Sequence, residues 1–290
     1  NDVVLANKGY VDLIVSDMFS HKTYNMGLVD ANNKVTFYDG KVRVTGPDGT
    51  EHAKYEAKEY LNYVAEHVEP YSYLKYPYLK KVGWKGFVDG VESGVYKATP
   101  LGRLNVSEGM ATPLAQAEYE RFYETLTGDR SGRTPVHSTL ATHWARVVEL
   151  VYACEAALEK AKDEEITSDH ILDPPTGIVG EGVGIVEAPR GTLTHHYKTD
   201  KNGIVTEANL IVGTTNNNAP ITMSIKRAAE GLIKKGVTVT DGMLNRIEMA
   251  FRAYDPCFGC ATHSLPGQMP LELVIHDAET GEVIDTVRRN

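Results

Sequence analysis

Two cysteines and a histidine near the end of the chain have the spacing of metal ligands. They are Cys257, Cys260 and His263, in the stretch AYDPCFGCATH. Thiolates are soft ligands, and two cysteines with two residues between them can reach one metal ion from a single tight loop. We therefore expect a metal site at this loop, with His263 as a further ligand.

Three other interpretations of the cysteine pair remain open on the residues alone. The two thiols could be buried neighbours without a ligand, because cysteine is commonly buried. A structural zinc site would need four ligands, so Cys154, His195 or His196 would have to complete it. A dithiol redox site usually lies between a strand and the start of a helix, whereas this pair follows an expected helix.

Two further stretches carry residues that could serve a site. In IVEAPRGTLTHHY, Arg190 stands between Pro189 and Gly191 and offers five donors in a fixed fork. It could equally be a surface arginine on a turn. In GTTNNNAP, the asparagines, Asn217 among them, could cap a helix or supply donors and acceptors to a buried site.

Composition limits the class of protein. The chain has 290 residues, is 42% hydrophobic and 24% charged, and carries a net charge of −9, which argues against a nucleic-acid partner. No apolar run approaches the roughly 20 residues that cross a bilayer, and no signal-peptide pattern is visible. An odd number of cysteines, two of them in a Cys-x-x-Cys pair, favours a reducing compartment, so we expect a cytoplasmic protein without a membrane partner.

The sequence pattern predicts an α+β fold, a mainly helical core of long helices with small peripheral antiparallel sheets. Expected helices cover residues 53–69, 112–126, 137–161, 218–235 and 240–252. Expected hairpins turn at Asp39–Gly40, at Asn202–Gly203 and at Gly281. Residues 71–81 are expected to be irregular, and residues 82–110 to form loops and short strands. Cys154 lies on an apolar helix face and is expected in the core.

Together these stretches resemble the large, catalytic subunit of a [NiFe] hydrogenase. AYDPCFGCATH is similar to the family's C-terminal Asp-Pro-Cys-x-x-Cys-x-x-His motif. EAPRGTLTHHY, the asparagine-rich turn and HVEPYSYLKYPYLK extend the resemblance over most of the chain. The residues around these motifs are most similar to those of the family's cytoplasmic group, whose members pass electrons to NAD, a deazaflavin or a heterodisulfide reductase.

The resemblance implies a nickel–iron centre with CO and cyanide ligands. Cys257 would be a terminal ligand to nickel and Cys260 would bridge nickel and iron. Arg190 would lie over the open face of the metals, and Pro189 would pack against the iron's diatomic ligands. His263 would help to bind magnesium or a similar ion. Asn217 would belong to the cofactor-binding residues.

The resemblance also implies partners. An iron–sulfur small subunit would take the electrons from reversible H2 cleavage, because three cysteines cannot hold both the active site and a cluster relay. Nickel-insertion proteins, a C-terminal endopeptidase and further electron-transfer subunits would complete the set.

The sequence departs from the family pattern in two ways. The family's N-terminal Arg-x-Cys-Gly-x-Cys motif, which supplies two more thiolates, has no counterpart in the 290 residues. Residues 264–290 follow His263, where the family's endopeptidase would cut. We therefore expect residues 1–263 to be the subunit body without its N-terminal part, and residues 264–290 to be an extension of an unprocessed, inactive precursor. The alternatives are a metal-free hydrogenase-like structural or maturation-docking protein, and a Cys/His zinc site.

Overall fold

The computed structural model of the chain describes residues 8–174, 176–262 and 271–289. Its helices are α2 Lys8–Ile14, α3 Tyr60–Tyr63, α4 Pro100–Val106, α5 Pro113–Thr127, α6 Ala141–Ala161, α7 Gly213–Asn216, α8 Asn218–Leu232, α9 Asp241–Arg252 and α10 Phe258–Thr262. Its strands are β1 Tyr24–Val29, β2 Lys41–Thr45, β3 Glu51–Tyr55, β4 Val64–Val68, β5 Lys75–Leu79, β6 Tyr96–Lys97, β7 Glu181–Ala188, β8 Gly191–Thr199, β9 Val205–Ile211, β10 Leu271–His276 and β11 Val283–Arg289.

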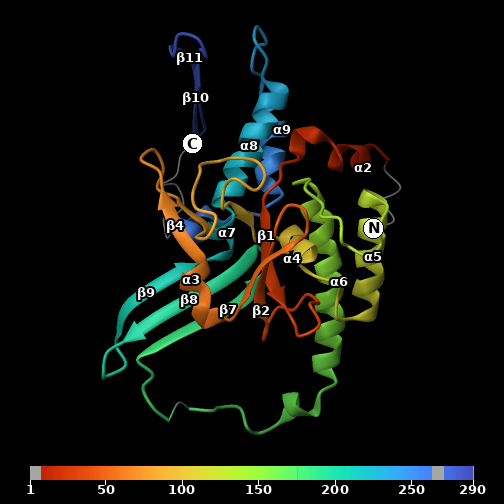
Figure 1. Ribbon diagram of the computed structural model, residues 1–290, viewed down its shortest axis with the longest axis vertical. Coiled ribbons are helices and arrows are strands. Elements are labelled where there is room, and N and C mark those ends of the chain that lie inside the picture. Colours follow the sequence, from red (N-terminus) through yellow and green to blue (C-terminus); the bar gives the residue numbers. More distant parts are fainter. Residues whose placement is uncertain (1–7, 175, 263–270, 290) are drawn as a thin grey trace.

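The strands form small sheets around the helices. One sheet has the order β3-β2-β1-β6, in which only the β1–β6 pair is parallel. A second sheet has the order β7-β8-β9, and β4–β5 and β10–β11 are separate antiparallel pairs. In Figure 1 the β7–β8–β9 sheet extends away from the helices, and the β10–β11 hairpin stands at the opposite end of the view.

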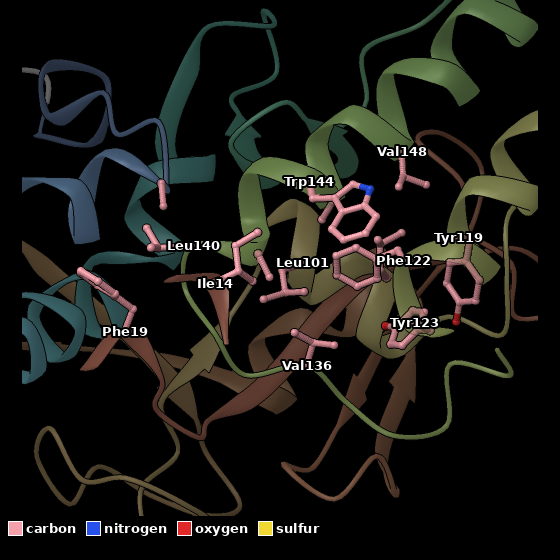
Figure 2. Close-up of a cluster of buried hydrophobic side chains, with 14 of the residues drawn as sticks. Ile14, Phe19, Leu101, Tyr119, Phe122, Tyr123, Val136, Leu140, Trp144 and Val148 are labelled. Atoms are coloured by element: carbon pink, nitrogen blue, oxygen red, sulfur yellow. The ribbon is translucent and has the colours of Figure 1, made fainter. Parts of the chain in front are cut away.

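One hydrophobic cluster joins α4, α5 and α6. Phe122 and Trp144 meet edge to face with ring centroids 5.3 Å apart, and Leu101 packs beside them (Figure 2). α5 begins at Pro113, which suits the first turn of a helix, and it ends at Gly128, whose φ of 76° is left-handed. A second cluster lies between the β1 sheet and the base of the β7–β8–β9 sheet.

Much of the predicted fold is confirmed. The α+β class with small antiparallel sheets is present, and the long helix predicted over 137–161 is α6, which begins at Ala141. Thr240 caps α9 by accepting a hydrogen bond from the amide of Met243, as its place before the helix suggests. Gly203 and Gly281 lie in turns with positive φ, at the predicted hairpins.

Other predictions were wrong where distant partners decide the structure. The helix predicted over residues 53–69 is helical only over 57–63, and its last part is strand, because β4 pairs with β5 in the stretch predicted to be irregular. The segment 82–110, predicted as loops and short strands, contains the short strand β6 but also the helix α4. The hairpin forms between β2 and β3, so its turn lies at 46–50 and not at Asp39–Gly40. Cys154 is exposed on α6, not in the core. Among the described helices, none has the length and apolar character to cross a membrane.

A layer of buried polar side chains lies on the β1–β6 pair. Lys97 Nζ donates to the main-chain oxygens of His21, at 2.9 Å, and His137, at 3.2 Å. Burial lowers the pKa of Lys97 to about 7. Burial and then the charge of Lys97 lower the pKa of His137 to about 4, and the same two causes hold the pKa of His21 well below its usual value. The imidazole of His137 is therefore neutral in the folded protein at pH 6.

Acid should destabilise the fold through this layer. Unfolding returns His137 to its ordinary pKa of 6.5, so the unfolded chain binds more protons than the folded chain between pH 6.5 and about 4. We expect the free energy of unfolding to fall with pH across this window, by on the order of 2 kcal/mol from His137. Urea denaturation at pH 7 and pH 4.5 measures it. The drop should shrink in His137→Gln but not in His170→Gln, since His170 is exposed. Equal drops in both variants would contradict the assignment.

Gly27 sets how closely α4 approaches β1. A Cβ added there would lie 2.8 Å from Arg103 Cγ and 3.0 Å from Arg103 Cα. We expect Gly27→Ala to lower the free energy of unfolding by about 1–3 kcal/mol through overpacking. Gly182→Ala is the matched control, since Gly182 is a strand glycine with nothing within 4 Å of the added atom. A loss of the same size in the control would mean that close approach is not the cause.

Candidate metal centre

The cysteine loop follows α9 and is anchored by Tyr254. This side chain is buried, its hydroxyl lies 2.9 Å from Ser224 Oγ, and it donates to the main-chain oxygen of Pro220 at 3.2 Å. Burial raises the pKa of Tyr254, so the hydroxyl keeps its proton. Arg146 of α6 adds a second anchor by donating to the main-chain oxygen of Ala253 at 3.0 Å. The loop therefore starts from a fixed point between α6 and α8.

The two predicted sulfur ligands lie side by side. Their Cα atoms are 5.3 Å apart, and the structure joins the Cys257 and Cys260 sulfurs in a disulfide. The amide of Cys257 donates to Thr214 Oγ1 at 3.0 Å, and the amide of Cys260 faces the Cys257 sulfur at 3.3 Å. Metals bind thiolates, so this pair must be reduced before it can serve as two ligands. Within one short loop, the geometry fits two of the thiolates of a metal centre.

Arg190 reaches the same loop from the other side of the site. It occupies a two-residue turn with Pro189, between Ala188 at the end of β7 and Gly191 at the start of β8. Its Nε donates to the main-chain oxygen of Asp255 at 2.7 Å and lies 3.2 Å from the Asp255 carboxylate. Both side chains are about half exposed, so this pair contributes little stability and chiefly fixes orientation. The arginine predicted from its turn is thus bonded two residues from Cys257.

Asn217 supports the arginine turn through the backbone. It is buried, and its Oδ1 accepts from the amide of Ala98 at 2.9 Å. Its Nδ2 donates to the main-chain oxygens of Arg190, at 3.0 Å, and Gly213, at 3.1 Å. Asn217 stands at the start of α8, but its side chain makes no helix-capping bond. In this structure the amide serves the backbone around the site, so its cofactor-binding role stays a prediction.

The remaining candidates are placed as follows. His263 lies outside the described residues. His196 is engaged by Tyr60, at 2.9 Å, and Glu181, at 2.8 Å, and His195 lies 3.0 Å from the hydroxyl of Tyr197. Among the residues the structure describes, no three His, Cys, Asp or Glu side chains are gathered to hold a metal ion.

Two residues that build the site, Thr214 and Arg146, were not expected as site residues from the sequence, and Asp255 was expected only as part of the cysteine motif. Asp255 stands within the cysteine motif, and its φ of 49° is a strained value that only the folded loop reveals. Thr214 and Arg146 bond the loop across 43 and 107 residues, so no local pattern could indicate them.

Comparison with known proteins identifies the family. A family model described as nickel-dependent hydrogenase matches residues 3–263. The chain belongs to the nickel-dependent hydrogenases.

Individual relatives agree with this assignment. The chain is 47% identical over 287 residues, or 99% of its length, to an iron-sulfur subunit of the F420-non-reducing hydrogenase of Archaeoglobus profundus. It is 42% identical over 263 residues to the beta subunit of the NAD-reducing hydrogenase HoxS of Cupriavidus necator. It covers 58% and 51% of these relatives, so it spans about half the length of the curated nickel-dependent hydrogenases that it matches.

Solved structures of the family share the fold. A crystal structure of an NAD+-reducing [NiFe]-hydrogenase in its H2-reduced state superposes on 90% of this chain with a TM-score of 0.79 and 34% identity. This chain covers 56% of that one. A [NiFeSe] hydrogenase variant from Desulfovibrio vulgaris Hildenborough matches with a TM-score of 0.57 at 19% identity, which shows the fold alone. The predicted resemblance is confirmed at the level of the family.

Counting thiols tests the cysteine loop. Under denaturing conditions without reductant, iodoacetamide should label only Cys154, because the loop cysteines are joined. After reduction with a phosphine, three labels should appear by intact mass. In Cys154→Ser the counts should be zero and two. Three labels without reductant would show that the loop carries free thiols.

Proposed function

We propose that this chain is the metal-binding part of the large subunit of a [NiFe] hydrogenase, which catalyses reversible cleavage of H2 into protons and electrons. One observation carries the proposal furthest: the loop that holds the two sulfurs side by side is bonded by Arg190 at Asp255, two residues before Cys257. Family membership supplies the metal class.

The residues would divide the work as follows. Cys257 and Cys260, once reduced, would hold the centre as a terminal nickel ligand and as a nickel–iron bridge. When bound, the nickel–iron centre with its CO and cyanide ligands supplies the redox chemistry. The Cys257 sulfur would accept the proton released from H2. Pro189 would shape the pocket around the diatomic ligands, with Asn217 behind the turn, and His263 would hold a magnesium or similar ion.

Arg190 is suited to electrostatics more than to proton transfer. A guanidinium keeps its charge at all ordinary pH values and presents a rigid fork of donors. Asp255 holds its Nε, which leaves the two terminal nitrogens of Arg190 for other partners. We infer that these nitrogens would stabilise the negative charge of the sulfurs and of the cyanide ligands when the centre is bound, and would help to exclude solvent from it.

The partners belong to the proposal as well. An iron–sulfur small subunit would receive the electrons, and further subunits would set the acceptor. The relatives' names differ on this point, since one is NAD-reducing and another is F420-non-reducing. We propose a cytoplasmic location, as the cysteine usage suggests.

We propose further that residues 264–290 form an extension that a C-terminal endopeptidase removes after nickel insertion. The arrangement of the described part of this segment supports the proposal: β10 and β11 pair only with each other among the described strands, and a 3.2 Å bond between Lys235 and Glu279 ties their turn to the α8–α9 connection. Before its removal, the extension would leave the chain able to dock nickel-insertion proteins.

The test uses the complete large subunit that contains this sequence, co-produced with its small subunit. We expect H2-dependent viologen reduction and bound nickel in the wild type, and loss of both in Cys257→Ser and Cys260→Ser, because each removes a ligand. Cys154→Ser is the matched control and should retain both, since that cysteine is exposed on α6. Intact mass should show loss of residues 264–290 only when nickel is supplied.

Contrary outcomes separate the alternatives. Bound zinc in place of nickel, lost in Cys257→Ser, would favour a Cys/His zinc site. Nickel and H2 activity that survive in both loop variants would overturn the proposal.

A further inference from the structure

We propose that Arg103 of α4 is a positioning residue for the hydrogenase reaction: it fixes the turn that aims Arg190 at the cysteine loop. The inference rests on the proposed function for its catalytic consequence. Among the described residues, the hydrogen bonds and ion pairs of Arg103 end on other segments than the cysteine loop. Arg103 acts through the main chain of the turn.

Arg103 spreads its donors over two carboxylates and two carbonyls. Nε and Nη2 each lie 2.6 Å from the Glu149 carboxylate, and Nη1 lies 2.8 Å from Glu187. Nη1 also donates to the main-chain oxygen of Ala188 at 2.9 Å, and Nη2 lies 3.5 Å from that of Pro189. The side chain is 1% exposed. Arginine alone has enough donors in a fixed plane for this set.

The turn is thereby held at three consecutive carbonyls. Arg103 takes the oxygens of Ala188 and Pro189, and Asn217 takes the oxygen of Arg190 at 3.0 Å. Gly191 completes the fit with a φ of 152°, where a Cβ would press on main-chain oxygens of neighbouring segments. A turn with every carbonyl fixed has little freedom to rotate. The direction in which the Arg190 side chain leaves the turn is therefore set by groups that lie behind it.

Glu187 connects this arrangement to the rest of the fold. Its Oε1 accepts from the amide of Leu28 in β1 at 2.7 Å and from Thr192 Oγ1 at 3.0 Å. Burial raises the pKa of Glu187, while Arg103 opposes that shift. Glu149 comes from α6, whose Arg146 bonds the residue before Tyr254. Both the arginine turn and the cysteine loop are therefore connected to α6, the turn through Glu149 and Arg103 and the loop through Arg146.

Stability alone does not explain such a group. Two buried carboxylates around one buried guanidinium carry a large desolvation cost, and apolar side chains of similar volume often stabilise as well or better. The charged set instead fixes direction, since its bonds end on two separate segments, α6 and the end of β7 with the turn that follows. A displacement of about 1 Å at a reacting centre can cost about 100-fold in rate. The position of the Arg190 guanidinium depends on a two-residue turn, so a movement of the turn by about 1 Å would displace the guanidinium by a similar distance.

The first test uses the 290-residue chain without metal. The Nε–H resonance of Arg190, assigned by its loss in Arg190→Lys, reports the bond to Asp255. We expect Arg103→Lys to shift this resonance and to speed its exchange with solvent, because the single ammonium of lysine lacks the planar fork that reaches both carboxylates and both carbonyls at once. Arg43→Lys is the matched control: Arg43 is also nearly buried and bonds Glu51, Glu108 and the main-chain oxygen of Val106, away from the turn. An unchanged Arg190 resonance in Arg103→Lys would overturn the inference.

The second test uses the complete, metal-containing enzyme. We expect Arg103→Lys to keep its nickel and its KM for H2, to lose roughly 10–100-fold in turnover, and to shift the infrared bands of the iron-bound CO and cyanide. If Arg103→Lys has the infrared bands and the turnover of the wild type, the positioning role is overturned and the proposed function is unaffected. If Arg103→Lys does not fold, Glu149→Gln removes one of the two carboxylate anchors and should shift the Arg190 resonance in the same direction. A wild-type enzyme without nickel or H2 turnover would overturn the proposed function alone, because the first test does not depend on it.

Discussion

Buried backbone groups must find hydrogen-bond partners, and the site depends on how this chain meets that requirement. Three consecutive asparagines, Asn216 to Asn218, lie where α7 ends and α8 begins, and they bond to residues in or next to β5, β6 and β8 and to the arginine turn. Asn216, for example, accepts from the hydroxyl of Tyr96 at 2.6 Å and donates to the main-chain oxygen of Thr192 at 2.6 Å. Segments that do not share a sheet are thereby held together at the point where the site forms.

Two buried cations show how differently this chain treats charge. Arg103 lies between two carboxylates and stays charged, so its donors keep fixed directions. Lys97 bonds main-chain oxygens, and burial lowers its pKa to about 7. A group that changes charge near neutral pH cannot hold a geometry across conditions. Arg103, with its two carboxylates, lies behind the turn that carries Arg190. Lys97, which titrates, lies in a separate layer beside His21 and His137.

The sequence was informative where local rules decide and uninformative where distant residues do. Thr240 at the start of α9 and Gly203 in its turn follow from cap and turn chemistry within a few residues. The tyrosine-rich stretch has helical periodicity, yet pairing with β5 makes β4 a strand, because tertiary contacts outweigh a weak local preference. The cysteine motif and Arg190 were visible as a resemblance. Arg103 was not, since its partners lie 46 and 84 residues away and the helix that carries it was itself unexpected.

The chemistry of the sulfur pair also imposes an order of events on the loop. Two adjacent thiolates repel each other, and the single guanidinium of Arg190 can offset only part of that charge. A loop without metal is therefore better served by paired or protonated sulfurs, and the structure has them paired. Converting the disulfide to two thiolates takes two electrons, and a divalent metal ion then supplies the positive charge that keeps them ionised. Cys260 is exposed and Arg190 is about half exposed, so a reductant and a metal can both approach. The supports behind the loop, from Tyr254 to Arg103, are already buried and bonded. We infer that reduction and metal binding would change the bonding of the two sulfurs and leave the buried side chains that aim Arg190 in place.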